Sequence, residues 1–181
     1  MSQVFVSGHK SPDTDSIAAA LSYSYLKRRL GMDAVAVRAG EINKESRFAL
    51  DYFNLEEPIL VTSVARKNPE DEKQKVILVD HNESKQTIDG MDDAEVLEII
   101  DHHRFGDFES ENPIFILVRP VGCVNTVIYG LYKANHIKPS REIAGIMLSA
   151  IISDTVLFRS PTTTEEDKET AKELAEIAGV D

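Results

Sequence analysis

Three short apolar runs constrain the fold of this chain more than any other feature. They lie at residues 75–79, 95–100 and 113–118, and Glu98 is the only polar residue from Val96 to Ile100. A sheet with one solvated face would show a polar residue at every second position, whereas these runs are almost continuous. Continuous apolar strands are typical of parallel sheets that are covered on both faces. The runs therefore predict a parallel sheet with a covering layer on each side.

The remaining segments alternate between strand and helix patterns. Further strands are predicted at residues 3–7, 33–38 and 58–61, and the polar stretch 65–74 is predicted to be a loop. Helices are predicted at residues 16–30, 44–53, 123–135 and 141–153, followed by an exposed helix that starts near Thr164. This alternation predicts an α/β fold with a mainly parallel central sheet flanked by helices. Without a recognisable linker or repeat, we expect residues 1–181 to form a single domain.

The composition of the chain indicates where the protein is located and which partners it does not bind. The chain starts without a long apolar stretch and no run approaches 18 apolar residues, so we expect no signal peptide and no transmembrane helix. The single cysteine, Cys123, excludes an internal disulfide and a cysteine-rich zinc site. A formal charge of −11 repels nucleic acid and anionic membranes. A cytoplasmic protein that binds neither is the expectation.

Polar clusters follow the apolar runs, at residues 8–16, 79–83, 101–104 and 153–155. Four of the five histidines lie in these clusters. In open parallel sheets, ligands bind outside the carboxyl ends of the strands, so we expect the clusters to meet there. Together they offer nine candidate side chains, namely His9, Asp13, Asp15, Asp80, His81, Asp101, His102, His103 and Asp154.

Each acidic residue alone has an ordinary structural explanation. Asp15 is well placed to cap a helix that starts at Ser16, and Asp13 after Pro12 suits a turn. Asp154 could be a polar residue that ends a buried helix, although an anion gains nothing at the C-terminus of a helix and would favour a nearby cation. Taken together, carboxylate and imidazole groups in this number indicate a site for Mn²⁺, Co²⁺, Mg²⁺ or Zn²⁺. They suit two ions about 3.5–4 Å apart that share one bridging carboxylate.

The adjacent histidines raise a geometric question. If the backbone at residues 102–103 is extended, their side chains point to opposite sides and cannot bind the same ion. One of the two would then bind metal. The other would face a substrate or support a ligand.

Four stretches, in this order, resemble the DHH phosphoesterase superfamily: GHKSPDTDSIAAA, ILVDHNE, DHHR and LSAIISDTVLFRSPTTTEED. In detail they are similar to its family II, the manganese-dependent inorganic pyrophosphatases, and the resemblance runs nearly end to end. It implies hydrolysis of pyrophosphate by a water held between two divalent ions, Mn²⁺ or Co²⁺. Additional Mg²⁺ would arrive with the substrate.

The resemblance also implies a role for each motif residue. It places His9, Asp13 and Asp80 around one ion and Asp15, Asp80, His102 and Asp154 around the other. Asp80 would bridge the two ions. His103 would face the substrate phosphate. The residues expected to act in catalysis are His103 and the metal ligand Asp15. Asp101 would orient its neighbours without touching metal.

The sequence departs from the family in one respect. Family members carry a C-terminal domain with a basic Ser-Arg-Lys motif that completes the substrate site, and no such motif occurs here. We therefore expect the chain to be the metal-binding half, poorly active alone, and to form the family's homodimer through an edge strand. Two alternatives stay open: a DHH-type phosphodiesterase for oligonucleotides or cyclic dinucleotides, and a non-catalytic metal-binding dimerisation module.

Overall fold

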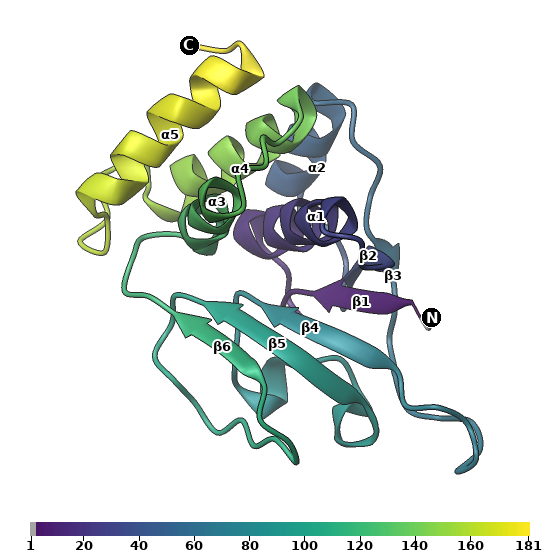
Figure 1. Cartoon of the computed structure of the whole chain (residues 1–181). Helices are drawn as coiled ribbons and strands as arrows, with labels where there is room; N and C mark the ends of the chain where they lie inside the picture. The colour runs from purple at the N-terminus through teal and green to yellow at the C-terminus, as the bar shows by residue number, and fades with distance from the viewer. Residues whose placement is uncertain (1–2) are drawn as a thin grey trace.

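A computed structural model describes residues 3–181, and Met1 and Ser2 lie outside it. Six parallel strands form one sheet in the order β3-β2-β1-β4-β5-β6 (Figure 1). The strands are β1 (Val4–Ser7), β2 (Ala34–Arg38), β3 (Ile59–Leu60), β4 (Lys75–Val79), β5 (Glu95–Asp101) and β6 (Phe115–Val118). The predicted α/β class and parallel sheet are confirmed.

Five α-helices accompany the sheet within the described residues. They are α1 (Thr14–Arg29), α2 (Lys44–Tyr52), α3 (Val124–Ala134), α4 (Arg141–Asp154) and α5 (Glu165–Ala178). Two 3₁₀ turns, η1 (Ser84–Gln86) and η2 (Met91–Asp93), lie between β4 and β5. The last helix is not fully exposed as predicted, because it packs on α4 and buries Ala171, Leu174 and Ala178.

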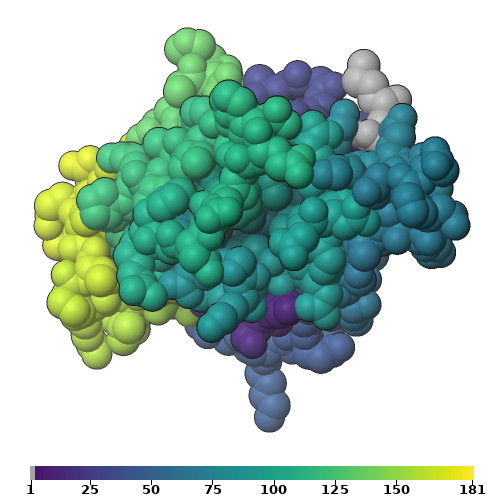
Figure 2. All heavy atoms as spheres, turned by 90° about the horizontal axis from the view of Figure 1, so that it is seen from below, coloured from purple at the N-terminus to yellow at the C-terminus, as the bar shows by residue number. Residues whose placement is uncertain are grey.

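The helices gather on one face of the sheet (Figure 1). The chain steps from β1 toward β3 in one direction and from β4 toward β6 in the other, and right-handed crossovers place the two sets of connections on opposite faces. The connections after β4 and β5 contain only η1, η2 and irregular segments. Both faces are covered, but the second cover consists of loops. Figure 2 views this loop side, where a hollow of about 930 Å³ opens between residues 84–97 and 107–114.

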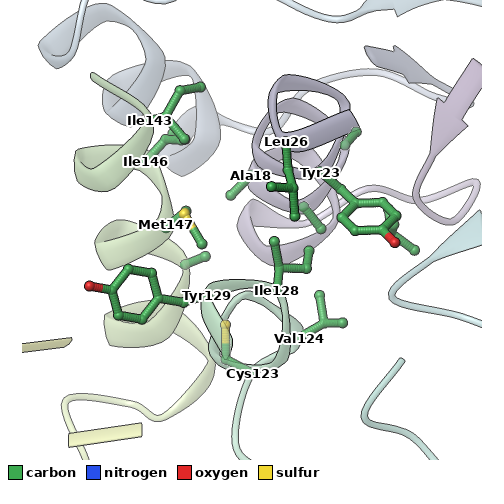
Figure 3. Packing of buried hydrophobic residues seen from close by; sticks show 14 of the residues in the cluster. Ala18, Tyr23, Leu26, Cys123, Val124, Ile128, Tyr129, Ile143, Ile146 and Met147 are labelled. Carbon is green, nitrogen blue, oxygen red and sulfur yellow. The ribbon is translucent and has the colours of Figure 1, made fainter. Parts of the chain in front are cut away.

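The main core lies between the sheet and the helical layer. Small alanines in α1 let neighbouring helices approach closely, and Ile128 and Met147 fill the space beside them (Figure 3). The helix α4 is buried around most of its circumference, as its almost uniformly apolar sequence predicts.

Glu98, the polar residue inside an apolar run, has a structural role. A register shift between Val76 and Ile77 places it opposite Ile77 in the neighbouring strand. Its carboxylate accepts hydrogen bonds from the Tyr23 hydroxyl and the Lys27 ammonium of α1, both at 2.6 Å. Glu98 therefore ties β5 to the longest helix, and its burial is balanced by two donors.

The topology also fixes where a ligand binds. The neighbouring strands β1 and β4 lead into connections on opposite faces of the sheet, which opens a crevice at their carboxyl ends. The segment from His9 to Asp15 follows β1, and Asp80 follows β4. The candidate side chains of these two segments therefore lie at the same crevice.

Candidate metal centre

Asp80 lies at the middle of the candidate site. Its backbone is left-handed, with φ at +63°, a conformation that Asp and Asn tolerate better than most residues. The side chain is 1% exposed. One carboxylate oxygen, Oδ2, accepts a hydrogen bond from Ser16 Oγ at 2.7 Å and lies 3.4 Å from His9 Nε2. The other oxygen, Oδ1, lies 3.3 Å from His102 Nε2. The two oxygens thus face two different imidazoles.

The first imidazole belongs to a group of three residues. His9 Nε2 lies 3.6 Å from Asp13 Oδ2, and the ligand atoms of His9, Asp13 and Asp80 lie within 4.8 Å of one another. Burial alone would lower the pKa of His9, but Asp13 and Asp80 outweigh it and raise this pKa to about 10. Asp13, not Asp15, is the N-cap of α1, because its Oδ1 accepts the Ser16 N–H at 2.9 Å. The helix starts two residues earlier than predicted.

Asp15 is instead a fully buried residue in the first turn of α1. Its carboxylate sits at the N-terminus of α3, where it accepts the Val124 N–H at 2.7 Å and the Asn125 side-chain amide at 2.6 Å. The Cys123 thiol donates to the same carboxylate at 2.8 Å. A helix N-terminus stabilises an anion, so α3 holds Asp15 in place. Sequence patterns do not reveal this support, since Asn125 belongs to none of the four clusters.

Asp154 completes the acidic side of the site. It is the last residue of α4, and its Oδ2 lies 3.8 Å from His102 Nε2. Burial, with added repulsion from Asp15, raises the pKa of Asp154 to about 11. Burial and the Asp80 carboxylate likewise raise the pKa of Asp15. The carboxylates are crowded enough that a cation between them would relieve strong repulsion.

His102 and His103 do not point to opposite sides. The strand β5 ends at Asp101, and a bend brings the two rings to a centroid distance of 4.2 Å. The premise of an extended backbone is therefore wrong, although the two rings differ in environment. His102 is 11% exposed and its Nδ1 lies 3.0 Å from the Val121 carbonyl oxygen. His103 is 53% exposed and its Nδ1 lies 2.8 Å from Asp101 Oδ1.

Asp101 organises the turn that carries both histidines. Its Oδ1 accepts the backbone N–H groups of His102 and His103, at 2.7 and 3.1 Å. Its Oδ2 accepts the Asn82 side-chain amide, which also donates to the Arg104 carbonyl at 3.0 Å. Asn82 therefore links the segment after β4 to the segment after β5. By sequence alone Asn82 is an ordinary strand exit, although its place directly after Asp80 and His81 is a usable signal.

Two buried atoms test whether ions fit this site. Asp80 Oδ1 and His102 Nε2 have no hydrogen-bond partner among the described residues, although they lie 3.3 Å apart. The Val121 carbonyl can only accept, so neutral His102 keeps its proton on Nδ1 and presents a lone pair at Nε2. Two facing acceptors need a positive charge between them, which is either a metal ion or a proton on Nε2. Burial would lower the pKa of His102, but Asp80 and Asp15 outweigh it and raise this pKa to about 9. Metal–ligand bonds of about 2.0–2.2 Å put neighbouring ligand atoms roughly 3–3.5 Å apart, which matches the spacing seen here. The residues fit divalent ions.

A model of the N-terminal domain of the DHH family matches residues 3–151. The chain belongs to the DHH family. The Asp-His-His sequence of the family name stands at residues 101–103, where the bend after β5 brings both imidazoles toward Asp80.

Comparison with individual proteins shows which members of the DHH family this chain is similar to. A "Probable manganese-dependent inorganic pyrophosphatase" from Exiguobacterium sp. is 53% identical over the whole chain, and one from Bacillus licheniformis is 55% identical. The chain spans 57% of the length of each. A crystal structure of a putative family II inorganic pyrophosphatase from Methanococcus jannaschii superposes with a TM-score of 0.88 and 43% identity, over 98% of this chain and 57% of that one. None of the helices among residues 3–181 has both the length and the hydropathy to cross a membrane.

Proposed function

We propose that this chain is the metal-binding half of a manganese-dependent inorganic pyrophosphatase, which hydrolyses pyrophosphate to phosphate. The observation that carries the proposal is the Asp80 carboxylate, whose two oxygens face the imidazole nitrogens of His9 and His102 at 3.4 and 3.3 Å. This is the arrangement that a bridging carboxylate requires. The names of the similar full-length proteins support the choice of metal and substrate.

Two ions would share six ligands, with Asp80 common to both. His9 and Asp13 would hold the first ion, and Asp15, His102 and Asp154 the second. Carboxylate and imidazole ligands suit Mn²⁺ or Co²⁺, and additional Mg²⁺ would accompany the substrate. When bound, such a pair lowers the pKa of a water molecule and neutralises phosphoryl oxygens.

The chain's own residues orient the substrate side. Asp101 holds His103 through Nδ1, so that Nε2 of this half-exposed ring is free to donate to a phosphate oxygen. The Asp101 hydrogen bond outweighs burial and raises the pKa of His103, which favours the charged, donating form. His103 would thus act at the substrate while Asp101 fixes its direction.

We propose that the chain alone has low activity. Of the basic side chains near the site, Lys10 is paired with Asp89 at 2.5 Å and Arg104 with Glu83 at 2.8 Å. The charge of each is already balanced by its own acidic partner, so the two together add little net positive charge for a polyanionic substrate. The similar pyrophosphatases extend well beyond the length matched here, and their additional part would supply the missing cations.

Calorimetry and a phosphate-release assay test this function. We expect two Mn²⁺ ions per chain and a rate about 10²- to 10³-fold below that of a full-length relative assayed in parallel, since one missing electrostatic contact already costs that much. Release of nucleotides from a dinucleotide in place of phosphate from pyrophosphate would favour a phosphodiesterase. Full turnover by the 181-residue chain would refute the proposed incompleteness.

The adjacent histidines should respond differently to substitution. His102→Ala removes an inward-facing ligand and should weaken one Mn²⁺ site by roughly 100-fold, because even the loss of a ligand's supporting group costs about 10- to 100-fold. His103→Ala removes a half-exposed ring and should leave both affinities within about threefold of the parent. Each affinity is read by Mn²⁺ calorimetry. Equal losses in both variants would contradict the division of roles.

We further propose a homodimer formed through β6. This strand lies at the edge of the sheet, and its Phe115 and Ile116 are 49% and 41% exposed. An apolar edge strand with free backbone groups favours pairing with a second copy. A monomer mass by light scattering at high micromolar concentration would count against this. The cytoplasmic location and the absence of nucleic-acid or membrane partners stay predictions.

A further inference from the structure

Cys123 stands at the start of α3, beside the second proposed ion. It is the N-cap residue of that helix, yet its side chain makes no capping hydrogen bond. The residue is completely buried inside the helical layer (Figure 3). Its thiol points to Asp15 and donates to Oδ1 at 2.8 Å. A position that commonly holds Ser, Thr, Asp or Asn here holds a sulfur aimed at a proposed metal ligand.

A second observation concerns the proposed ion position next to Asp15. The atoms Asp80 Oδ1 and His102 Nε2 are buried and lack partners among the described residues. The same His102 Nε2 lies 3.5 Å from Asp15 Oδ2 and 3.8 Å from Asp154 Oδ2. Ligand atoms of Asp15, Cys123 and Asp154 also lie within 4.8 Å of one another. Asp15 and Asp154 are thus common to two groups, one that contains the Cys123 sulfur and one that contains the His102 imidazole.

The chemistry of the two ligand types differs with the ion. Mg²⁺ and Mn²⁺ favour oxygen, whereas Zn²⁺ and softer ions such as Cd²⁺ favour sulfur. A coordinated thiol loses its proton outright. If Cys123 became a ligand, its S–H bond would break, the proton would leave to solvent and a metal–sulfur bond would form. Asp15 would keep its donors from Val124 and Asn125 and so remain in place.

We propose that Cys123 makes the second ion position sensitive to the softness of the metal. With Mn²⁺ or Mg²⁺ the thiol stays protonated and donates to Asp15, and with a thiophilic divalent cation the sulfur enters the coordination shell. The inference rests on the proposed function, because it requires the ion held by Asp15, His102 and Asp154. The chain would then bind a thiophilic ion through a metal–sulfur bond that the manganese-loaded site lacks.

A titration with Cd²⁺ tests the proposal. A cadmium–thiolate bond absorbs in the near ultraviolet, and the chain contains one cysteine, so a band can arise only from Cys123. We expect the band to reach its full height at one Cd²⁺ per chain and to be absent with Mg²⁺. Cys123→Ser keeps a donor for Asp15, so it should retain Mn²⁺ affinity within about threefold and lose about tenfold or more in Cd²⁺ affinity.

The possible outcomes distinguish a failure of the Cys123 inference from a failure of the proposed metal centre. If calorimetry shows that Cd²⁺ displaces Mn²⁺ but no band forms, the sulfur stays outside the shell and the inference is wrong. The inference also fails if Cys123→Ser binds Cd²⁺ as tightly as the parent. If neither ion binds the parent chain, the proposed metal centre itself fails. Far-ultraviolet circular dichroism confirms that the serine variant is folded.

Discussion

Replacing Asp80 by asparagine is expected to weaken binding of both ions, not of one. The reason is that each Asp80 oxygen faces a different imidazole, so the substitution removes a charged ligand from both proposed positions. Loss of a group that merely supports a ligand costs about 10- to 100-fold in affinity, and loss of the shared ligand should cost roughly 100-fold or more at each position. Calorimetric titration with Mn²⁺ measures both constants.

Asparagine is the right substitute because of the backbone at this position. Asp80 has a φ of +63°, which Asn adopts readily and Ala does not, so the variant should fold. Asp89→Asn is a matched control, since Asp89 pairs with Lys10 at the surface, outside the proposed ligand set. It should bind both ions normally. If Asp80→Asn lost one ion and held the other at full affinity, Asp80 would not be the bridge.

Replacing Asp167 by alanine is expected to cost roughly 3–5 kcal/mol of unfolding free energy, because several buried donors would lose their acceptor. Asp167 is fully buried at the start of α5. Its carboxylate accepts the Gly122 N–H at 2.8 Å, the Thr126 hydroxyl at 2.6 Å and the Thr164 N–H at 2.7 Å. It therefore joins α5 to the loop and helix that hold Asp15. Urea denaturation measures the change.

Glu165→Ala provides the control for this loss. Glu165 lies in the same first turn of α5, but its carboxylate is 82% exposed and, among residues 3–181, pairs only with Lys168 at the surface. Its removal should change the unfolding free energy by less than about 1 kcal/mol. Similar effects from both substitutions would show that Asp167 acts only as a helix-terminal charge and does not join α5 to α3.

The sequence could predict the parts of the site that depend on strand ends. The apolar run before Asp80 ends where the strand ends, and the same holds for the run before Asp101, so their meeting at one edge follows from parallel pairing. The acids in the first turn after Thr164 similarly predict the start of the last helix, which Thr164 caps. Local patterns suffice for such features.

Other features depend on contacts between distant segments. Asp15 is held by Val124 and Asn125, which lie 109 and 110 positions away, and no local pattern reports such a pair. The predicted start of α1 was wrong because both Asp13 and Asp15 are good capping residues, and only the tertiary burial of Asp15 decides between them. The bend at residues 102–103 arises from Asp101, which draws both following N–H groups to its own carboxylate.

A crystal of the chain grown with Mn²⁺ and measured at an anomalous-scattering wavelength tests the two-ion centre most directly. We expect two peaks about 3.5–4 Å apart, one on each side of the Asp80 carboxylate. One peak should lie beside His9 and Asp13, and the other beside His102 and Asp154. A single peak, or two peaks that do not share Asp80, would contradict the bridged two-ion centre.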